Sequence, residues 1–222
     1  MSRKAGLAKK IAHTLMAMSI VYSSGINIVI NEAYAAEKTV DITNSSGGTR
    51  FEETGKDGAD FTSGGKITDG ESASIVGIIK DDTFTNAISV KADGGDGGND
   101  DKSSPTVMEG SKGGDAFAKV TVDESKNNVT LGSITVKATG GMNGSSYQGI
   151  SQVAGAAAAY GLEVKHDLTI IAANIDVSAE TDQVFRLGGV DTGSNERKDV
   201  LAVGLQIDSG NAVSYTHLRA HE

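Results

Sequence analysis

Histidine and cysteine, the side chains that most often supply nucleophiles, general bases and transition-metal ligands, are scarce in this chain. Cysteine is absent, and of four histidines one lies near the start and two in the last ten residues, which leaves His166. A cysteine nucleophile and a multi-histidine metal site are therefore excluded from the central part of the chain. His166 lies between Lys165 and Asp167, where a strand is expected to end, so we interpret it as an exposed turn residue and not as a triad base.

Carboxylates are the remaining candidates for chemistry. Residues 36–212 hold 27 acidic side chains, and a pair of them could act as general acid and general base. No spacing singles out such a pair, so we predict that the protein is not an enzyme. The alternative is a secreted polysaccharide-active enzyme with a β-helical fold, which would need a carboxylate cluster in a groove on one face.

One glycine-rich stretch resembles a metal-binding motif. The sequence GGDGGND, residues 94–100, is similar to a single imperfect copy of the calcium-binding repeat G-G-x-G-x-D. In that motif, carboxylate and backbone oxygens bind the ion, which would make Asp96, Asn99 and Asp100 the candidate ligands. Asn99 stands where the motif has aspartate, and no apolar residue follows. We therefore expect no cofactor, with calcium as the one candidate, and interpret residues 93–115 as a flexible loop extruded from the fold.

Two short patterns recur along the chain and indicate a repeated structural unit. The pattern A-x-G-L-x-[V/I] occupies residues 159–164 and 202–207, and a looser copy occupies residues 116–122. The pattern I-x-V-x-A occupies residues 88–92, 134–138 and 175–179. The copies return every 41–46 residues, so each unit contains two short alternating segments.

The alternation of apolar and polar residues predicts strands with one buried face. Ile134 and Val136 would then point inward, while Thr135 and Lys137 would face solvent. Like residues at a nearly constant interval favour an all-β fold of the parallel β-helix (solenoid) type, in which each coil buries its inward residues against the next. We take half a unit, about 21–23 residues, as one coil. An antiparallel sandwich of short strands is the alternative.

The first 35 residues have the features of a helical secretory signal peptide in their usual order. The first ten residues carry four positive charges, the next twenty carry none, and Ala33 and Ala35 place small side chains at the two positions that signal peptidase reads. We expect cleavage between Ala35 and Ala36, and export of the protein. A retained membrane anchor is the alternative, because about 20 uncharged residues can just span a bilayer, but polar residues interrupt the stretch.

The charge that remains after this leader limits the possible partners. Residues 36–212 hold 15 basic and 27 acidic side chains. Such a balance opposes nucleic-acid binding, which requires neutralisation of phosphates, so we expect no nucleic-acid partner. The absence of cysteine and tryptophan, a single proline and 29 glycines suit a narrow β architecture without disulfides.

The last ten residues depart from every pattern above. VSYTHLRAHE, from Val213 to Glu222, resembles a translation of the adapter DNA used in transposase-based sequencing. We therefore expect the natural sequence to continue differently after Ala212. The predicted organisation is a signal peptide at 1–35, a lead-in at 36–69, partial β-helix repeats at 70–212 and an artefactual tail at 213–222.

The long leader and the two repeated patterns together resemble the passenger region of Gram-negative autotransporters and related adhesins, over residues 70–212. The resemblance implies a structural stalk or adhesion role at the cell surface. It also implies anchoring through a C-terminal outer-membrane β-barrel that does not occur before Ala212. The partner would be an unidentified ligand on a host or neighbouring cell. The alternatives are the secreted β-helical enzyme and another surface β-repeat protein, such as a trimeric adhesin.

Overall fold

The computed structural model describes ten segments of the chain. They are residues 19–21, 27–29, 36–44, 50–61, 66–99, 111–144, 154–181, 200–207, 212–215 and 218–221. The regular elements among these residues are all strands, and the chain divides into two compact units, Met1–Tyr34 and Ala35–Glu222. In the described segments, no helix is long and apolar enough to cross a membrane.

The first unit contains a short antiparallel pair, β1 (Ser19–Val21) and β2 (Asn27–Val29), with Ile20 opposite Ile28. We predicted a helix here, and the six described residues are extended instead. Their sequences, SIV and NIV, are rich in β-branched side chains, which favour strands over helices. The cleavage residues Ala33 and Ala35 lie outside the described residues, and Ala36 is the first described residue after them.

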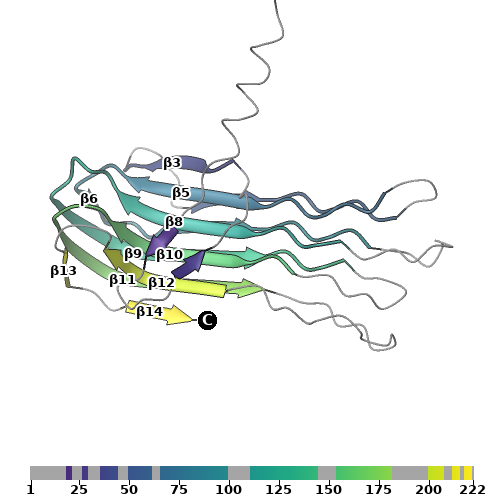
Figure 1. Ribbon diagram of the computed structural model, residues 1–222. Coiled ribbons are helices and arrows are strands. Elements are labelled where there is room, and N and C mark those ends of the chain that lie inside the picture. Colours follow the sequence, from purple (N-terminus) through teal and green to yellow (C-terminus); the bar gives the residue numbers. More distant parts are fainter. Residues whose placement is uncertain are drawn as a thin grey trace, which may run out of the picture. The chain divides into compact units, whose positions relative to one another are not determined.

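The second unit is built on two parallel sheets (Figure 1). The first sheet has the order β12-β10-β8-β5-β3. Its strands are β3 (Lys38–Ile42), β5 (Ala73–Ile79), β8 (Ala116–Val122), β10 (Ala157–Val164) and β12 (Val200–Ile207). The second sheet has the order β13-β11-β9-β7-β4, with β6 also on β9 and β14 also on β11. Its strands are β4 (Arg50–Thr54), β6 (Thr83–Phe84), β7 (Ile88–Asp93), β9 (Asn128–Gly140), β11 (Leu168–Thr181), β13 (Ala212–Tyr215) and β14 (Leu218–His221).

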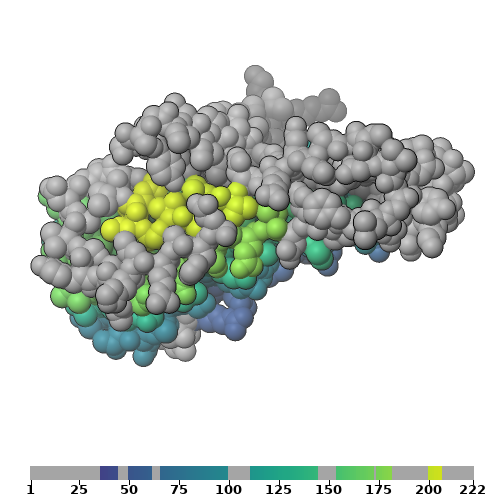
Figure 2. All heavy atoms as spheres, turned by 90° about the horizontal axis from the view of Figure 1, so that it is seen from below, coloured from purple at the N-terminus to yellow at the C-terminus, as the bar shows by residue number. Residues whose placement is uncertain are grey.

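The chain alternates between the two sheets, and each return adds a strand parallel to the previous one. In the first sheet Ala73, Ala116, Ala157 and Val200 lie side by side, 43, 41 and 43 residues apart. The strand order therefore follows the sequence order, which Figure 2 shows as a gradual change of colour from blue through green to yellow. This parallel pairing is inconsistent with the antiparallel sandwich. It also shows that our prediction of one coil per half unit was wrong. The two halves of each unit lie in different sheets, so a strand returns to the same sheet only after a whole unit.

The I-x-V-x-A segments pair in register in the second sheet, as their spacing predicted. The positions form three ladders of like residues: Ile88, Ile134 and Ile175; Val90, Val136 and Val177; and Ala92, Ala138 and Ala179. All nine side chains are almost completely buried. Their polar neighbours Thr135 and Lys137 lie on the opposite face, so the predicted alternation is confirmed.

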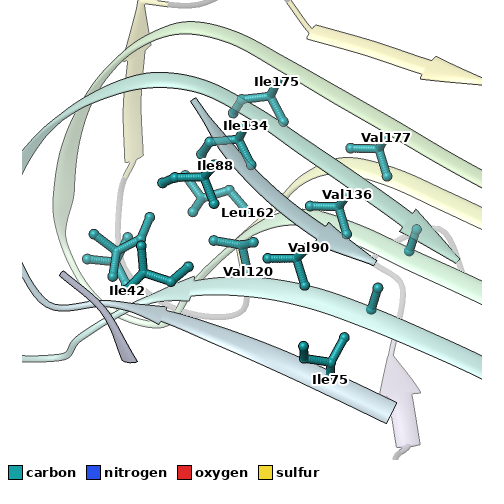
Figure 3. Packing of buried hydrophobic residues seen from close by; sticks show 14 of the residues in the cluster. Ile42, Ile75, Ile88, Val90, Val120, Ile134, Val136, Leu162, Ile175 and Val177 are labelled. Carbon is teal, nitrogen blue, oxygen red and sulfur yellow. The ribbon is translucent and has the colours of Figure 1, made fainter. Parts of the chain in front are cut away.

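The core lies between the two sheets and is formed by these ladders and by inward side chains of the first sheet. Figure 3 shows Ile75, Val120 and Leu162 of the first sheet facing the isoleucine and valine ladders of the second. One inward-facing ladder of the first sheet consists mostly of small side chains. It starts at Ile75 and continues through Ala118, Ala159 and Ala202. Small and branched side chains on opposite faces thus fill most of a thin core, to which Phe84 of β6 adds a buried aromatic ring.

Residues 36–69, which we predicted to precede the repeats, contribute the first strand of each sheet, since β3 pairs with β5 and β4 pairs with β7. These two edge strands are rich in charge. Lys38 pairs with Glu53 at 2.6 Å and Arg50 pairs with Glu52 at 2.5 Å. Charged side chains on an edge strand oppose the addition of further strands.

Six segments without strand structure, each with at least one glycine, continue the chain beyond one end of the strands, where they run side by side (Figure 1). We call them the arms: residues 55–61, 66–72, 94–99, 111–115, 141–144 and 154–156. Two of them belong to the stretch 93–115 that we predicted to be a flexible loop. Residues 94–99 and 111–115 are instead fixed by hydrogen bonds to other arms, and residues 100–110 lie outside the described residues.

The tail described above as adapter-like contributes most of β13 and all of β14, which pair in parallel with β11. An unpaired strand edge offers N–H and C=O groups to an extended segment of almost any sequence. This pairing therefore does not depend on the origin of residues 213–222, and the adapter interpretation stays a prediction.

A charged ladder connects neighbouring repeats where the chain leaves the first sheet. Lys80 lies 2.6 Å from Asp123 and 3.7 Å from Asp41. The hydrogen bond from Lys80, followed by two from Ser125, holds the pKa of Asp123 far below its ordinary value of 3.8. The same hydrogen bond raises the pKa of Lys80 above 10.5.

These shifts give a pH dependence of stability. Folding lowers the pKa of Asp123, so the ionised carboxylate stabilises the folded state. This contribution to the free energy of unfolding is complete above pH 3.8 and is lost as the pH falls toward the pKa of the folded state. Lys80 has the opposite sign, so its contribution is complete below pH 10.5 and is lost above it. We expect Asp123→Asn to lower the urea midpoint at pH 7, by an amount that shrinks as the pH approaches 2. An equal difference at both pH values would contradict this assignment.

Candidate functional site

Two of the three candidate calcium ligands, Asp96 and Asn99, lie in the third arm, directly after β7. Asp96 Oδ1 accepts a hydrogen bond from the Met142 N–H at 2.8 Å, and the Asp96 N–H donates to Asp57 Oδ1 at 2.9 Å. Asn99 donates through its N–H and its side-chain amide to Asp60 Oδ1, at 2.7 and 3.0 Å. The acidic and amide groups of this stretch therefore join neighbouring arms.

The third candidate ligand, Asp100, lies outside the described residues. Among the residues that the structure describes, no three histidine or acidic side chains come together in a way that could hold a metal ion. The hydrogen bonds of Asp96 and Asn99 give these side chains a structural role that needs no ion. The signal that could have revealed this role is that Asp57 and Asp60 of the first arm return as Asp96 and Asn99 in the third, 39 residues later.

His166 follows the end of β10, as the sequence predicted. Its environment differs from the prediction, because the ring is half-buried and Nε2 donates to the carbonyl oxygen of Lys126. This contact joins two neighbouring repeats. The histidine is thus part of the packing between repeats and not a free turn residue.

The outward faces of the two sheets differ strongly in character. On the second sheet the outward positions are mostly polar, including Thr135, Lys137 and Glu180, and they are half-buried or exposed. On β5, β8 and β10 of the first sheet nearly every residue is buried, including the outward positions. The outward ladders there run Ser74, Phe117, Ala158, Leu201 and Val76, Lys119, Tyr160, Val203.

The centre of this first-sheet face is a compact group of aromatic and charged side chains, which we call the outer-face cluster: Phe117, Lys119, Tyr160 and Glu163. The Phe117 and Tyr160 rings lie 5.7 Å apart at 49°. Lys119 Nζ lies 5.7 Å from the Phe117 ring centre and 3.0 Å from Glu163 Oε2. The Lys119 and Glu163 side chains are only 8% and 4% exposed, so this is a buried ion pair.

A bulge in β10 brings Tyr160 and Glu163 to the same face although they are three residues apart. The register of β10 against β8 shifts between these two residues. Gly161 occupies the bulge, where a Cβ atom would lie 2.5 Å from the Gly204 carbonyl oxygen and from Val177 Cγ2. Close packing thus requires the glycine of the A-x-G-L-x-V pattern. The bulge that it permits turns Leu162 into the core.

Sequence reasoning identified the strands that carry the outer-face cluster but missed the cluster itself. Lys119 and Glu163 lie on different strands, and a strict alternation from Tyr160 would place Glu163 on the inward face. The available signal was the charged residue between apolar neighbours in AFAKVTV. A scan against protein-family models finds no match for this chain, and searches of the curated proteins and of the solved structures also find none.

Proposed function

We propose that the chain is the N-terminal part of a cell-surface passenger of the autotransporter or adhesin type, in which residues 36–212 form a parallel β-helix. The observation that carries the proposal is the register of the parallel strands. Like residues stack on like residues every 41–43 residues while the chain passes from one sheet to the other. Such stacking transmits load along a continuous core and suits a stalk.

The proposed role is structural support and adhesion without catalysis. The buried ladders and the ion pairs between repeats, such as Lys137 with Glu180 at 2.7 Å, favour a rigid support. In this proposal the protein is exported by its leader to the outer surface of a Gram-negative bacterium and is held at the outer membrane. Its ligand belongs to a host or neighbouring cell.

The proposal is tested in the bacterium that encodes the protein. We expect antibodies against the chain to label intact cells and added protease to remove the signal, because a passenger faces the medium. A cytoplasmic protein of the same cells serves as the control and should stay intact. Labelling that requires permeabilised cells would contradict the surface role.

Processing of the leader can be measured independently. We expect the mature protein to begin at Ala36 by intact mass and N-terminal sequencing, because Ala33 and Ala35 fit the peptidase site. Replacing Ala35 with arginine should leave the precursor uncleaved, whereas replacing the exposed Glu37 with glutamine should not. A mature protein that retains residues 1–35 would contradict the signal-peptide assignment.

A further inference from the structure

The arms are joined by backbone hydrogen bonds with a period of three residues. Every third N–H group of the first arm donates to every third carbonyl oxygen from the last residue of β7 onward. The bonds are Gly55 to Asp93 at 2.8 Å, Gly58 to Asp96 at 2.6 Å and Phe61 to Asn99 at 2.8 Å. A strand repeats every two residues and an α-helix every 3.6, so neither explains this pattern.

Arms that run in opposite directions are joined with the same period. Along these pairs the donor advances by three residues while the acceptor retreats by three. The bonds are Thr68 to Ala59 and Glu71 to Lys56; Gly95 to Glu71 and Gly98 to Thr68; and Gly141 to Gly114 and Gly144 to Ser111. Each arm therefore bonds both to a neighbouring arm of its own direction and to an arm of the opposite direction.

A period of three identifies the backbone conformation. An extended helix with three residues per turn forms no hydrogen bonds within its own segment. Its N–H and C=O groups must then pair with neighbours on several sides. In the third arm every N–H group from Gly94 to Asn99 donates to another segment. No described glycine of the arms has a φ in the left-handed region, so their glycines are not needed for a turn.

Close approach of the backbones explains the glycines instead. A Cβ atom on Gly95 would lie 2.0 Å from the Lys56 carbonyl oxygen, one on Gly141 2.0 Å from that of Gly95, and one on Gly155 1.8 Å from that of Gly114. The hydrogen atoms on these Cα atoms thus face carbonyl oxygens of adjacent arms and form weak hydrogen bonds. Any other residue would push the arms apart, as at the axis of collagen.

Aspartate and serine side chains accept hydrogen bonds from further backbone N–H groups of the arms. These bonds join equivalent positions of successive arms of the same direction. The donor–acceptor distances are 2.6–3.0 Å. The pairs, N–H donor first, are Asp96 with Asp57, Asn99 with Asp60, Lys112 with Asp69, Asp115 with Ser72, Met142 with Asp96, and Ala156 with Asp115. The Gly-Gly-Asp pattern therefore has a complete explanation in hydrogen bonding between arms.

We propose that the arms form a second structural module, a two-layered bundle of polyglycine-type helices that projects from one end of the two sheets. The bundle is held by glycine backbones and aspartate side chains, without metal, and fixes the spacing between the outgoing and returning arms. Its function is to extend the two sheets as a rigid module. This inference stands independently of the proposed surface role.

The first arm marks the boundary of the bundle. Lys56 and Ala59 occupy the positions equivalent to Gly95 and Gly98 of the third arm, 39 residues later. Both side chains are exposed, whereas the two glycines are buried against the first arm. Non-glycine residues at these two positions prevent a further arm from packing there, as the charged strands β3 and β4 do for the sheets.

The primary test is hydrogen–deuterium exchange on the full chain. We expect the amides of Gly95, Gly98, Gly141 and Gly144 to exchange slower than in a random coil by about two orders of magnitude or more, because each is bonded inside the bundle. Excess calcium and excess chelator should leave these rates unchanged. Exchange at the random-coil rate, or protection that disappears with chelator, would overturn the proposal.

A matched pair of alanine variants tests the glycine packing. Gly95→Ala should abolish amide protection throughout the arms, whereas Lys56→Ala at the equivalent exposed position should preserve it. Equal protection in both variants would contradict the bundle. If Gly95→Ala fails to fold, the exchange rates of the unmodified chain still decide the question.

A second pair tests the aspartate bonds. Asp96→Asn keeps an oxygen that can accept the Met142 N–H, and Asp96→Ala does not. We expect the Met142 amide to stay protected in the first variant and to lose its protection in the second. Loss in both variants would indicate that the carboxylate charge matters, as in a metal site, and would count against the proposal.

Discussion

Replacement of Ile134 by alanine is expected to lower the free energy of unfolding by about 2–5 kcal/mol. Ile134 is completely buried and stands in the middle of the isoleucine ladder, between Ile88 and Ile175 (Figure 3). Truncation therefore removes contacts to both neighbouring repeats and to the opposite sheet. The thin core between two hydrogen-bonded sheets cannot close around the cavity, which favours the upper part of the range.

The measurement is urea unfolding of the full chain, followed by circular dichroism. Thr135→Ala is the matched control, because Thr135 is adjacent in sequence but exposed on the other face. We expect the control to change stability by no more than about 0.5 kcal/mol. Similar losses for the two variants would mean that the strand does not bury one face, and would contradict the core described here.

The second large effect is expected at the buried ion pair of the outer-face cluster. Lys119→Met leaves the Glu163 carboxylate buried without Lys119, and Glu163→Leu leaves the Lys119 ammonium buried without its partner. Removing one member of a buried pair costs about 3–5 kcal/mol. Glu163 also lies 3.3 Å from Lys165, so we expect Lys119→Met to be the milder of the two changes.

The double variant Lys119→Met, Glu163→Leu distinguishes a buried pair from two independent charges. Replacing both members by apolar groups of similar size is often nearly neutral, so we expect the double variant to be more stable than either single variant. The exposed pair Lys137 and Glu180 is the control, and its removal should cost at most about 1 kcal/mol. Additive losses at Lys119 and Glu163 would contradict the assignment.

The sequence was most informative about the strands and their pairing partners. The I-x-V-x-A segments identified which residues stack, because side chains in one ladder of a parallel sheet share one environment and converge on one size. The A-x-G-L-x-V copies likewise predicted that Ala159 lies beside Ala202 and Leu162 beside Leu205. The prediction of 21–23 residues per coil was wrong, because the alternation of buried and exposed residues does not indicate to which sheet a segment belongs.

The glycine-rich arms show the opposite case. Read alone, GGDGGND has too little apolar area to order itself, so we predicted a flexible loop with a possible calcium motif. Its order comes from other arms: the residues bonded to Gly95 and Gly98 lie in the segment 66–72. A single segment of a bundle without internal hydrogen bonds carries no sign of its partners, and only their positions in space reveal them.

The sequence by itself therefore determined the all-β class, the alternation of buried and exposed residues and the spacing of the repeats, because these depend on neighbours along the chain. The tertiary structure decided three further features: the division of each repeat between two sheets, the outer-face cluster and the packing of the arms. Each of these depends on contacts between residues about 40 positions apart, such as Lys119 with Glu163 or Gly95 with Lys56. Local periodicity carries no information about contacts at such sequence separations, because only the folded backbone brings these groups together.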